Sequence, residues 1–429
     1  MSGYTPDLVT SLHKALAGLT ENQYPTVESP ETTKKRASVA LIIRVQPHYS
    51  HWPDRDAEKV TDLGSFFQKD WVKHGDPEVL FIKRAARKGD RWTSHIALPG
   101  GRRDPEDEDD LAAAIRETRE EVGLDLSEDN ALQAGNLPQR VVTTHWGRVP
   151  LMVLCPYIFL VTRHDVPPLK LQPTEVASTH WVPLSALLSA DQRTEVHEDV
   201  SNRLANQETG VKRWMLRGMV GQMIFSAIRL LPSETIHCNA SPAEKPKSPS
   251  NLLSWLLGTK PQLAPANHER PLLLWGLTLG VVGDFLDFLP PHDALRLWSY
   301  PTFTPWDVRL VIWLMTYGFK QRKMREISQI QARSPPAVEV GLDAVSPPKE
   351  TRHGSRYIHR AGLTGISTGV DPAFFRTELK SSAVGTMLDG YYDIVRRAVA
   401  LALIGRTSVA MAFLAWVIVR YRRSRYQYN

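Results

Sequence analysis

Apolar runs with polar or turn residues at their ends recur along the first two thirds of the chain. Runs of this kind that are rich in Val, Ile and Leu indicate buried strands. The predicted strands are residues 37–45, 78–84, 94–98, 140–144, 151–162 and 223–231. Residues 7–19 have the pattern of a short helix. A second helical face, which we expect to pack against the domain, consists of Leu63, Phe66, Phe67 and Trp71.

The most clearly patterned helix is predicted to begin at Asp109 or Asp110 and to end at Val122. Either aspartate can accept hydrogen bonds from the first free amides of the helix, and Gly123 can adopt the left-handed conformation that ends one. At about 100° per residue, four side chains fall within a narrow arc that we expect to face a core. They are Leu111, Ile115, Thr118 and Val122.

Three carboxylates lie together on roughly the opposite side of this helix. Glu117, Glu120 and Glu121 are close neighbours on a helical surface, so their mutual repulsion costs free energy unless a cation offsets it. Hard divalent ions such as Mg2+ prefer oxygen ligands of this kind. Arg116 lies beside the carboxylates and can bond to Glu120, one turn further on.

The residues before the helix add a turn and an acidic loop. Gly100 and Gly101 allow the backbone to turn where a Cβ atom would be in the way, and Asp104 with Pro105 predicts a further turn. A Glu-rich helix by itself is more often a solvated acidic surface. The double glycine, the acidic loop and the carboxylate-bearing helix in one continuous run (99–124) together favour a metal site.

This run is similar to the signature sequence of Nudix hydrolases. The matching residues are Gly101, Asp107, Arg116, Glu117, Glu120, Glu121, Gly123 and Leu124. The interval from Gly101 to Arg116 is one residue longer than in the commonest form of the Nudix signature. Asp107 or Glu108 stands at the position of the acidic residue in the loop of that signature. Thr118 stands where an aliphatic residue is usual, and an insertion in a loop costs little. The resemblance implies an α/β fold, namely a Nudix-type α/β/α sandwich with a mixed sheet.

The resemblance also implies roles for the residues of the run. Glu117 and Glu121 are expected as the principal metal ligands, and Glu120 as a ligand or as the general base. Arg116 is expected to orient these groups, and the carbonyl of Gly100 is a further candidate ligand. The expected ion is Mg2+ or Mn2+. Because Nudix enzymes place their general base variously, the choice of base stays open.

A basic segment precedes the glycines, and it contains Arg84, Arg87, Lys88 and Arg91. A strand ending in Arg, a basic loop and an apolar strand leading into Pro-Gly-Gly resemble the coenzyme A diphosphatase branch, although Ser94 stands where that branch often has Gly. This resemblance implies substrate binding by Arg84, Arg87 and Gly101, and a solvated basic loop is the alternative. Glu175 resembles an acid that Nudix domains carry between their last strands, so it is either an extra site carboxylate or a turn acid.

The predicted function is Mg2+-dependent hydrolysis of a pyrophosphate bond in a nucleoside diphosphate linked to another group, with a coenzyme A-like compound expected first. The expected partner is therefore a nucleotide-containing small molecule. The alternative is a membrane-tethered Nudix-fold binding or sensor module without turnover, against which the presence of Arg116 and all three helix carboxylates counts. Nucleic-acid binding is not expected, because the basic segments lack interleaved aromatic residues.

Composition shifts divide the chain into four parts. Residues 1–36 are predicted to be an N-terminal extension, and residues 37–292 the hydrolase domain, with a flexible insertion rich in Pro, Ser, Ala and Lys at about 233–268. Residues 272–289 have the hydropathy of a membrane span. Two aspartates interrupt them, however, and we expect a final strand that runs into a packed helix.

The remainder of the chain is predicted to be helical and membrane-associated. Residues 293–385 are expected to hold a linker and an interfacial helix, whose apolar run 310–319 is too short to span a bilayer. Residues 386–429 are predicted to form a membrane segment with a basic tail. Within it, 398–419 is long enough to cross ~30 Å of hydrocarbon, but Arg406 near its middle makes spanning marginal. An interfacial helix, or a helix buried in a soluble C-terminal domain, is the alternative.

The formal net charge of +6 comes mostly from the tail, which carries Arg420, Arg422, Arg423 and Arg425. The two cysteines, Cys155 and Cys238, imply no disulfide framework, so a reducing compartment is expected. The first residues lack the apolar run of a secretory signal. We therefore expect an intracellular, membrane-associated protein, with the mitochondrion and the peroxisome as candidate organelles.

Overall fold

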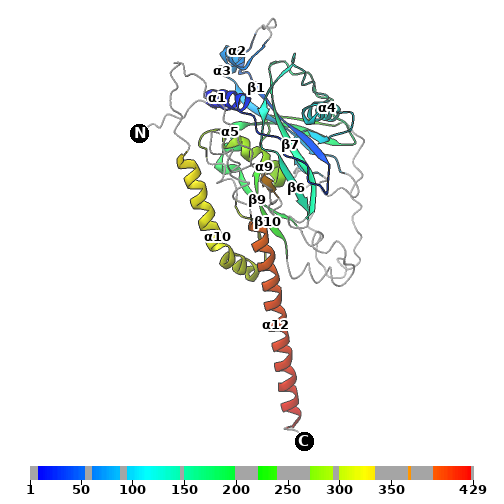
Figure 1. Cartoon of the computed structure of the whole chain (residues 1–429), viewed down its shortest axis with the longest axis vertical. Helices are drawn as coiled ribbons and strands as arrows, with labels where there is room; N and C mark the ends of the chain where they lie inside the picture. The colour runs from blue at the N-terminus through cyan, green and yellow to red at the C-terminus, as the bar shows by residue number, and fades with distance from the viewer. Residues whose placement is uncertain are drawn as a thin grey trace, which may run out of the picture.

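A mixed sheet forms the centre of the fold (Figure 1). The computed structural model describes residues 8–53, 60–86, 94–144, 149–198, 221–238, 271–292, 299–333, 366–368 and 390–426. The central strands are β2 (Asp76–Arg84), β1 (Arg36–Gln46) and β7 (Val149–Val161). β1 pairs with β7 in parallel and with β2 antiparallel, so the mixed sheet implied by the resemblance is confirmed.

Shorter strands extend this sheet on both sides. They are β3 (Ile96–Ala97), β4 (Gly100–Arg102), β5 (Ala131–Asn136), β6 (Arg140–Thr144), β8 (Val176–Pro183), β11 (Glu234–His237) and β14 (Ile366–Thr368). β8 pairs with β2 and carries β11 beyond it, whereas β5 and β6 both pair with β7. β4 pairs with β1, which places the double glycine against the middle of the sheet.

The segment that leads into the glycine pair differs from the strand expected at 94–98. Within the expected strand, only the two residues of β3 pair with another strand, namely β2. β4 forms a second short strand where a turn was expected. Ser94 has a φ of 60°, in the left-handed region that favours glycine. This conformation is a physical reason for the glycine that often stands at this position in the coenzyme A diphosphatase branch.

Helices cover both faces of the sheet. The helices on one face are α1 (Leu8–Glu21), α2 (Leu63–Gln68), α3 (Asp70–Lys73), α5 (Leu184–Leu188) and α9 (Gly276–Leu286). They pack with Leu41 and Ile43 of β1, while α4 (Asp110–Val122) packs in a separate cluster with Ala40 and Ile42. Successive strand residues point to opposite faces, so the two clusters are the two cores of an α/β/α sandwich.

Two expected helical segments pack into the first core. α1 lies within the expected N-terminal extension, and its Leu12 and Leu16 are fully buried. The helical face around Phe66 and Trp71 forms α2 and α3 and is buried as predicted. Residues of the predicted N-terminal extension therefore contribute directly to the first core of the sandwich.

A second, smaller sheet lies beside the first. Its strands are β9 (Arg193–Glu198), β10 (Met223–Arg229), β12 (Leu273–Trp275) and β13 (Thr302–Phe303). β12 runs directly into α9, as predicted for residues 272–289, and most of α9 is buried inside the domain. Asp284 of α9 forms a buried ion pair with Arg140, which explains how an acid is accommodated in this apolar helix.

Two long helices follow, α10 (Trp306–Arg333) and α12 (Tyr391–Tyr426). The predicted apolar run 310–319 lies in the N-terminal half of α10, which continues well beyond it. α12 starts beside Phe319 and Lys320 of α10, runs antiparallel to α10 as far as its N-terminal end, and then projects away from the domain (Figure 1). Within the part of the chain that the structure describes, α12 is the helix that is long and apolar enough to cross a membrane, over residues 391–421. The flexible insertion predicted at about 233–268 begins instead with β11, because the backbone there pairs with β8, and its part from residue 239 lies outside the described residues. Most of the linker predicted within 293–385 also lies outside them.

Candidate active site

The two glycines of β4 each make a close approach that a side chain would prevent. Gly100 has a φ of 144°, and a Cβ atom there would lie 2.2 Å from the carbonyl oxygen of Ser38 in β1. A Cβ atom at Gly101 would lie 2.4 Å from the carboxyl carbon of Glu117. Gly100 therefore lets two backbones meet, and Gly101 leaves room for a carboxylate of α4.

α4 begins and ends where the sequence predicted. The side chain of Asp109 accepts a hydrogen bond from the amide of Ala112 at 2.7 Å, and Gly123 ends the helix with a φ of 71°. Thr118 and Val122 are fully buried, which confirms the predicted apolar stripe. The hydroxyl of Thr118 donates to the carbonyl of Ala114 over 2.8 Å, so a polar residue fits this core position without an unpaired donor.

The three glutamates of α4 lie in different environments. The side chain of Glu120 is 58% exposed and that of Glu117 is 14% exposed, whereas Glu121 is buried at 2%. The expectation that all three face away from the apolar side is therefore wrong for Glu121. Glu121 is next to Val122 along the helix and lies under β4, where its Oε2 accepts a hydrogen bond from the amide of Gly100.

Burial makes the charged forms of two glutamates unfavourable. Burial raises the pKa of Glu121 to about 8, and the neighbouring Glu117 and Glu175 raise it too, while the Gly100 amide and Arg84 oppose the rise. Burial also raises the pKa of Glu117, although Arg116 opposes this. The structure thus brings Arg84 and Glu175 into the electrostatic surroundings of Glu121, from positions far apart in the sequence.

This set of groups fits a hard divalent cation. Carboxylate oxygens are the ligands that Mg2+ and Mn2+ prefer, and Glu117 and Glu121 supply them on adjacent turns of one helix. The raised pKa of the buried Glu121 also fits a cation site, because ionising Glu121 next to Glu117 is unfavourable until a positive charge is present. The residues of this site are therefore able to hold such an ion.

Arg116 connects the acidic loop to the glutamates. Its guanidinium donates two hydrogen bonds to Asp107, at 2.8 and 2.9 Å, and one to Glu120 at 3.1 Å. It also forms an ion pair with Glu117 at 3.2 Å. The predicted contact with Glu120 is confirmed, and Asp107 occupies the loop-acid position. Arg116 is thus placed to fix the orientation of two site carboxylates.

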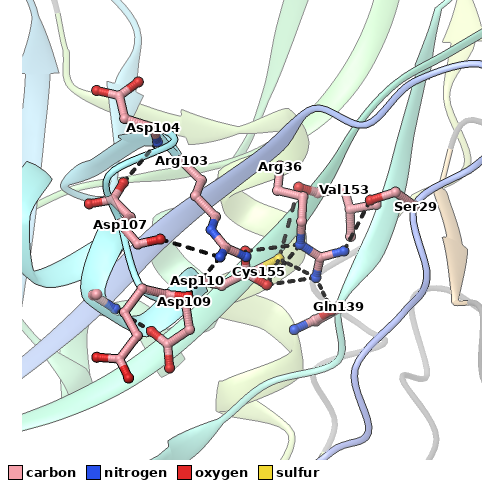
Figure 2. A network of polar contacts seen from close by, with 12 residues as sticks. Ser29, Arg36, Arg103, Asp104, Asp107, Asp109, Asp110, Gln139, Val153 and Cys155 are labelled. Atoms are coloured by element: carbon pink, nitrogen blue, oxygen red, sulfur yellow. Dashed lines mark hydrogen bonds and ion pairs between the residues drawn. The ribbon is translucent and has the colours of Figure 1, made fainter.

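A buried network holds the start of α4, and the sequence did not indicate it (Figure 2). Arg36 of β1 donates to both carboxylate oxygens of Asp110, at 2.9 and 2.8 Å, and it also contacts Gln139 and Cys155. From the other side, Arg103 bonds the carbonyls of the acidic loop and lies 3.5 Å from Asp110. Asp110 was expected only as a candidate cap, and nothing in the sequence pairs it with Arg36.

The predicted basic segment is represented by Arg84 alone. Arg84 ends β2 and acts electrostatically on Glu121, and its role in substrate binding stays a prediction. Arg87, Lys88 and Arg91 lie outside the described residues.

Comparison with known proteins gives one family match and one extensive relative. The family model of the NUDIX domain matches residues 71–204, a range that includes β4 and α4. A Schizosaccharomyces pombe protein described as uncharacterized is 32% identical over 324 residues, which are 74% of this chain and 83% of that protein.

Two further similarities are more limited. The human mitochondrial coenzyme A diphosphatase NUDT8 is 41% identical over 56 residues, which are 13% of this chain and 24% of the human protein. The matched part is thus about a quarter of that relative. The crystal structure of a MutT/nudix family protein from Enterococcus faecalis matches 53% of this chain and 63% of its own chain, at 18% identity and a TM-score of 0.24.

Proposed function

This chain belongs to the Nudix hydrolase family, and from that premise we propose that it is a Mg2+- or Mn2+-dependent enzyme that cleaves the pyrophosphate bond of a nucleoside diphosphate linked to another group. Pyrophosphate hydrolysis is the activity of the family. The metal dependence rests on one observation, the buried Glu121 beside Glu117 under the glycines of β4.

Each site residue has a proposed part in the reaction. When bound, the ion supplies neutralisation of the phosphate oxygens and a lower pKa for the attacking water. Glu117 and Glu121 hold the ion, with the carbonyl of Gly100 as a further ligand. Glu120 is the most exposed of the three glutamates and is held by Arg116, so it is the proposed acceptor of the proton from water.

The proposed substrate is coenzyme A or a similar adenosine diphosphate derivative. The similarity to the human coenzyme A diphosphatase supports this choice, as does the position of Arg84 near the carboxylates, where Arg84, Arg87 and Gly101 would contact the phosphates. The test is to incubate the full chain, in detergent and with Mg2+, with coenzyme A, NADH, ADP-ribose and diadenosine tetraphosphate. Mass spectrometry should find both products of pyrophosphate cleavage, with coenzyme A cleaved fastest. An inositol pyrophosphate is added to the panel, and cleavage limited to it or to diadenosine tetraphosphate would contradict the proposed substrate.

The alternative is a Nudix-fold binding or sensor module without turnover. The presence of Arg116 and of all three glutamates in one hydrogen-bonded unit favours the enzyme. The same incubation separates the two functions, because a sensor would bind a nucleotide and release no product with either ion.

We further propose that residues 386–429 anchor the enzyme to an intracellular membrane, with mitochondria and peroxisomes as the candidate organelles. The length, apolar composition and exposure of α12 support an anchor. Carbonate extraction of cell membranes tests the anchor. We expect the full chain in the pellet, and the same chain without residues 386–429 in the supernatant. Full-length protein in the supernatant would contradict the anchor.

A further inference from the structure

α10 has two apolar faces, and only one of them is covered by the protein. Val308, Ile312 and Thr316 are buried against α12 and the smaller sheet. The opposite face carries five large exposed side chains: Trp306, Leu310, Trp313, Leu314 and Tyr317. At about 100° per residue these five positions form one continuous stripe along the helix. We call this set of five residues the α10 stripe.

The exposed charges around the α10 stripe have one sign, and the acid in the first turn of the helix, Asp307, is paired with Arg406 of α12. Between residues 306 and 318, the exposed residues outside the stripe are Arg309 and Gly318, and the described exposed positions there include no carboxylate. The following turns add two exposed cations, Arg322 and Arg325, whereas Lys320 and Lys323 are half-buried and Lys320 lies over the ring of Tyr300. Trp and Tyr beside Leu, with basic residues and no acids, are the composition of helices that lie in the headgroup region of a membrane.

α12 changes its environment beside the N-terminus of α10. Tyr391, Val395 and Ala398 are buried against α10 and the smaller sheet, whereas every residue from Thr407 to Tyr421 is exposed. Residues 401–419 extend over about 28 Å as a helix, close to the ~30 Å hydrocarbon thickness of a bilayer. Four arginines follow this stretch, and no acid follows Asp393 in the sequence.

An ion pair joins the two helices at the point where they separate. The guanidinium of Arg406 in α12 donates to both carboxylate oxygens of Asp307, in the first turn of α10. The one charge within the apolar part of α12 is thereby paired with an acid. The pair also places the start of the α10 stripe beside the beginning of the exposed part of α12, and Figure 1 shows this end of α10 against the side of α12.

We propose that the α10 stripe binds the surface of the same lipid bilayer that α12 crosses, with its Trp and Tyr side chains at the headgroup level. The Asp307–Arg406 pair then holds the first turn of α10 beside the point at which the exposed part of α12 begins. A lipid surface fits the stripe better than a protein partner, because the stripe continues into the exposed apolar part of α12 and is flanked by cations that attract anionic lipids. This inference rests on the proposed membrane anchor and adds a second, separate contact.

Site-specific fluorescence in the full chain tests the α10 stripe separately from the anchor. Cys238→Ser leaves Cys155, which is buried, as the remaining native cysteine. On this background, an NBD label is attached at one new cysteine, made by Leu314→Cys in α10, Leu414→Cys in α12 or Tyr49→Cys in the hydrolase domain. All three positions are exposed. Each labelled protein is reconstituted in vesicles of phosphatidylcholine with phosphatidylserine, and the emission maximum and quenching by a nitroxide-bearing lipid are measured.

We expect a blue shift and lipid quenching at positions 314 and 414, with shallower quenching at 314, and neither effect at 49. A label at 314 that stays in water while the label at 414 enters lipid would overturn the α10 contact and leave the anchor intact. If neither label enters lipid, the anchor and the α10 contact both fail. The emission of the label at 314 could instead be equally blue-shifted in detergent micelles and in vesicles, without quenching by the nitroxide-bearing lipid. That result would show that protein covers the stripe, would assign it to a contact with a second copy, and would overturn the proposal.

Discussion

The backbone amide of Gly100 donates a hydrogen bond to Oε2 of Glu121 over 2.9 Å. This bond joins the strand that carries the two glycines to the last turn of the helix that carries the carboxylates. It fixes the orientation of the buried Glu121, which is the proposed ligand, and preorganised ligands lose less entropy when they bind. The site is therefore defined by a contact between β4 and α4 as much as by the glutamates themselves.

Glu117→Gln and Glu121→Gln should each lower kcat by about 100-fold or more, because each removes one charged ligand from the proposed metal site. Both variants should remain folded, since Gln has nearly the same shape as Glu. Steady-state kinetics with Mg2+ and circular dichroism check this. Glu128→Gln is the matched control, because Glu128 is an exposed glutamate beyond the end of α4. Near-normal kcat in either site variant would remove that residue from the ligand set.

The stability of the metal-free protein should fall as the pH rises from about 4.5 to about 8. Burial raises the pKa of Glu121 from 4.5 to about 8, so within this window the folded protein holds a proton on Glu121 that the unfolded chain has released. Glu121→Gln removes this titration. The melting temperature of the variant should therefore rise relative to that of the natural protein across the window.

Added Mg2+ should reduce this difference, and more strongly at pH 8 than at pH 5, because the ion binds the ionised form. Thermal melts of both proteins in EDTA and in Mg2+ over this pH range provide the measurement. Parallel melting curves for the natural protein and the variant would show that Glu121 does not titrate in the folded state between these values.

Gly101→Ala should weaken metal binding and leave the protein folded. The new Cβ atom would meet the carboxylate of Glu117, which is the end of a flexible side chain and can move aside. The apparent affinity for Mg2+ in activity assays should fall by about 10-fold or more, the loss typical of a displaced or unsupported ligand. Gly18→Ala in α1 is the matched control, because no atom lies within 4 Å of its added Cβ. Equal Mg2+ dependence in the two variants would contradict a role of Gly101 in positioning Glu117.

Asp110→Asn should destabilise the protein by about 3 kcal/mol, because it leaves the guanidinium of Arg36 without its charged partner in a buried network. Denaturant unfolding measures this change. Asp165→Asn is the control, since it breaks an exposed pair with Arg163 and should cost less than about 1 kcal/mol. Similar losses in the free energy of unfolding of both variants would indicate that the network around Asp110 stabilises the protein no more than an exposed ion pair does.

The parts of the fold that depend on local sequence were predicted well. The caps at Asp109 and Gly123 and the spacing of Thr118 and Val122 determine α4 within one short segment. Helical periodicity predicts the direction in which a side chain points, but not whether another element of the fold covers it. For this reason the burial of Glu121 under β4 was missed, although the position of its Cβ on the helix was known.

The long-range contacts could not be predicted from a single sequence. Arg36 meets Asp110, and Asp307 meets Arg406, across 74 and 99 residues of chain. Ordinary surface arginines and aspartates have the same local surroundings in the sequence, so no pattern marks these four residues as partners. Their pairing depends on how β1 lies against α4 and how α12 lies against α10.

The connection between α12 and the domain is rigid at its first turn. The hydroxyl of Tyr391 donates to the carbonyl of Pro301 at 2.7 Å, and its ring is fully buried beside Phe303 and Val308. An enzyme joined to its membrane anchor by a flexible linker can rotate freely above the membrane, so substrates reach its active site from every direction. A catalytic domain fixed through Tyr391 would instead keep one distance from the membrane and one orientation. Its active site would therefore always face the solution at the same distance from the lipid surface.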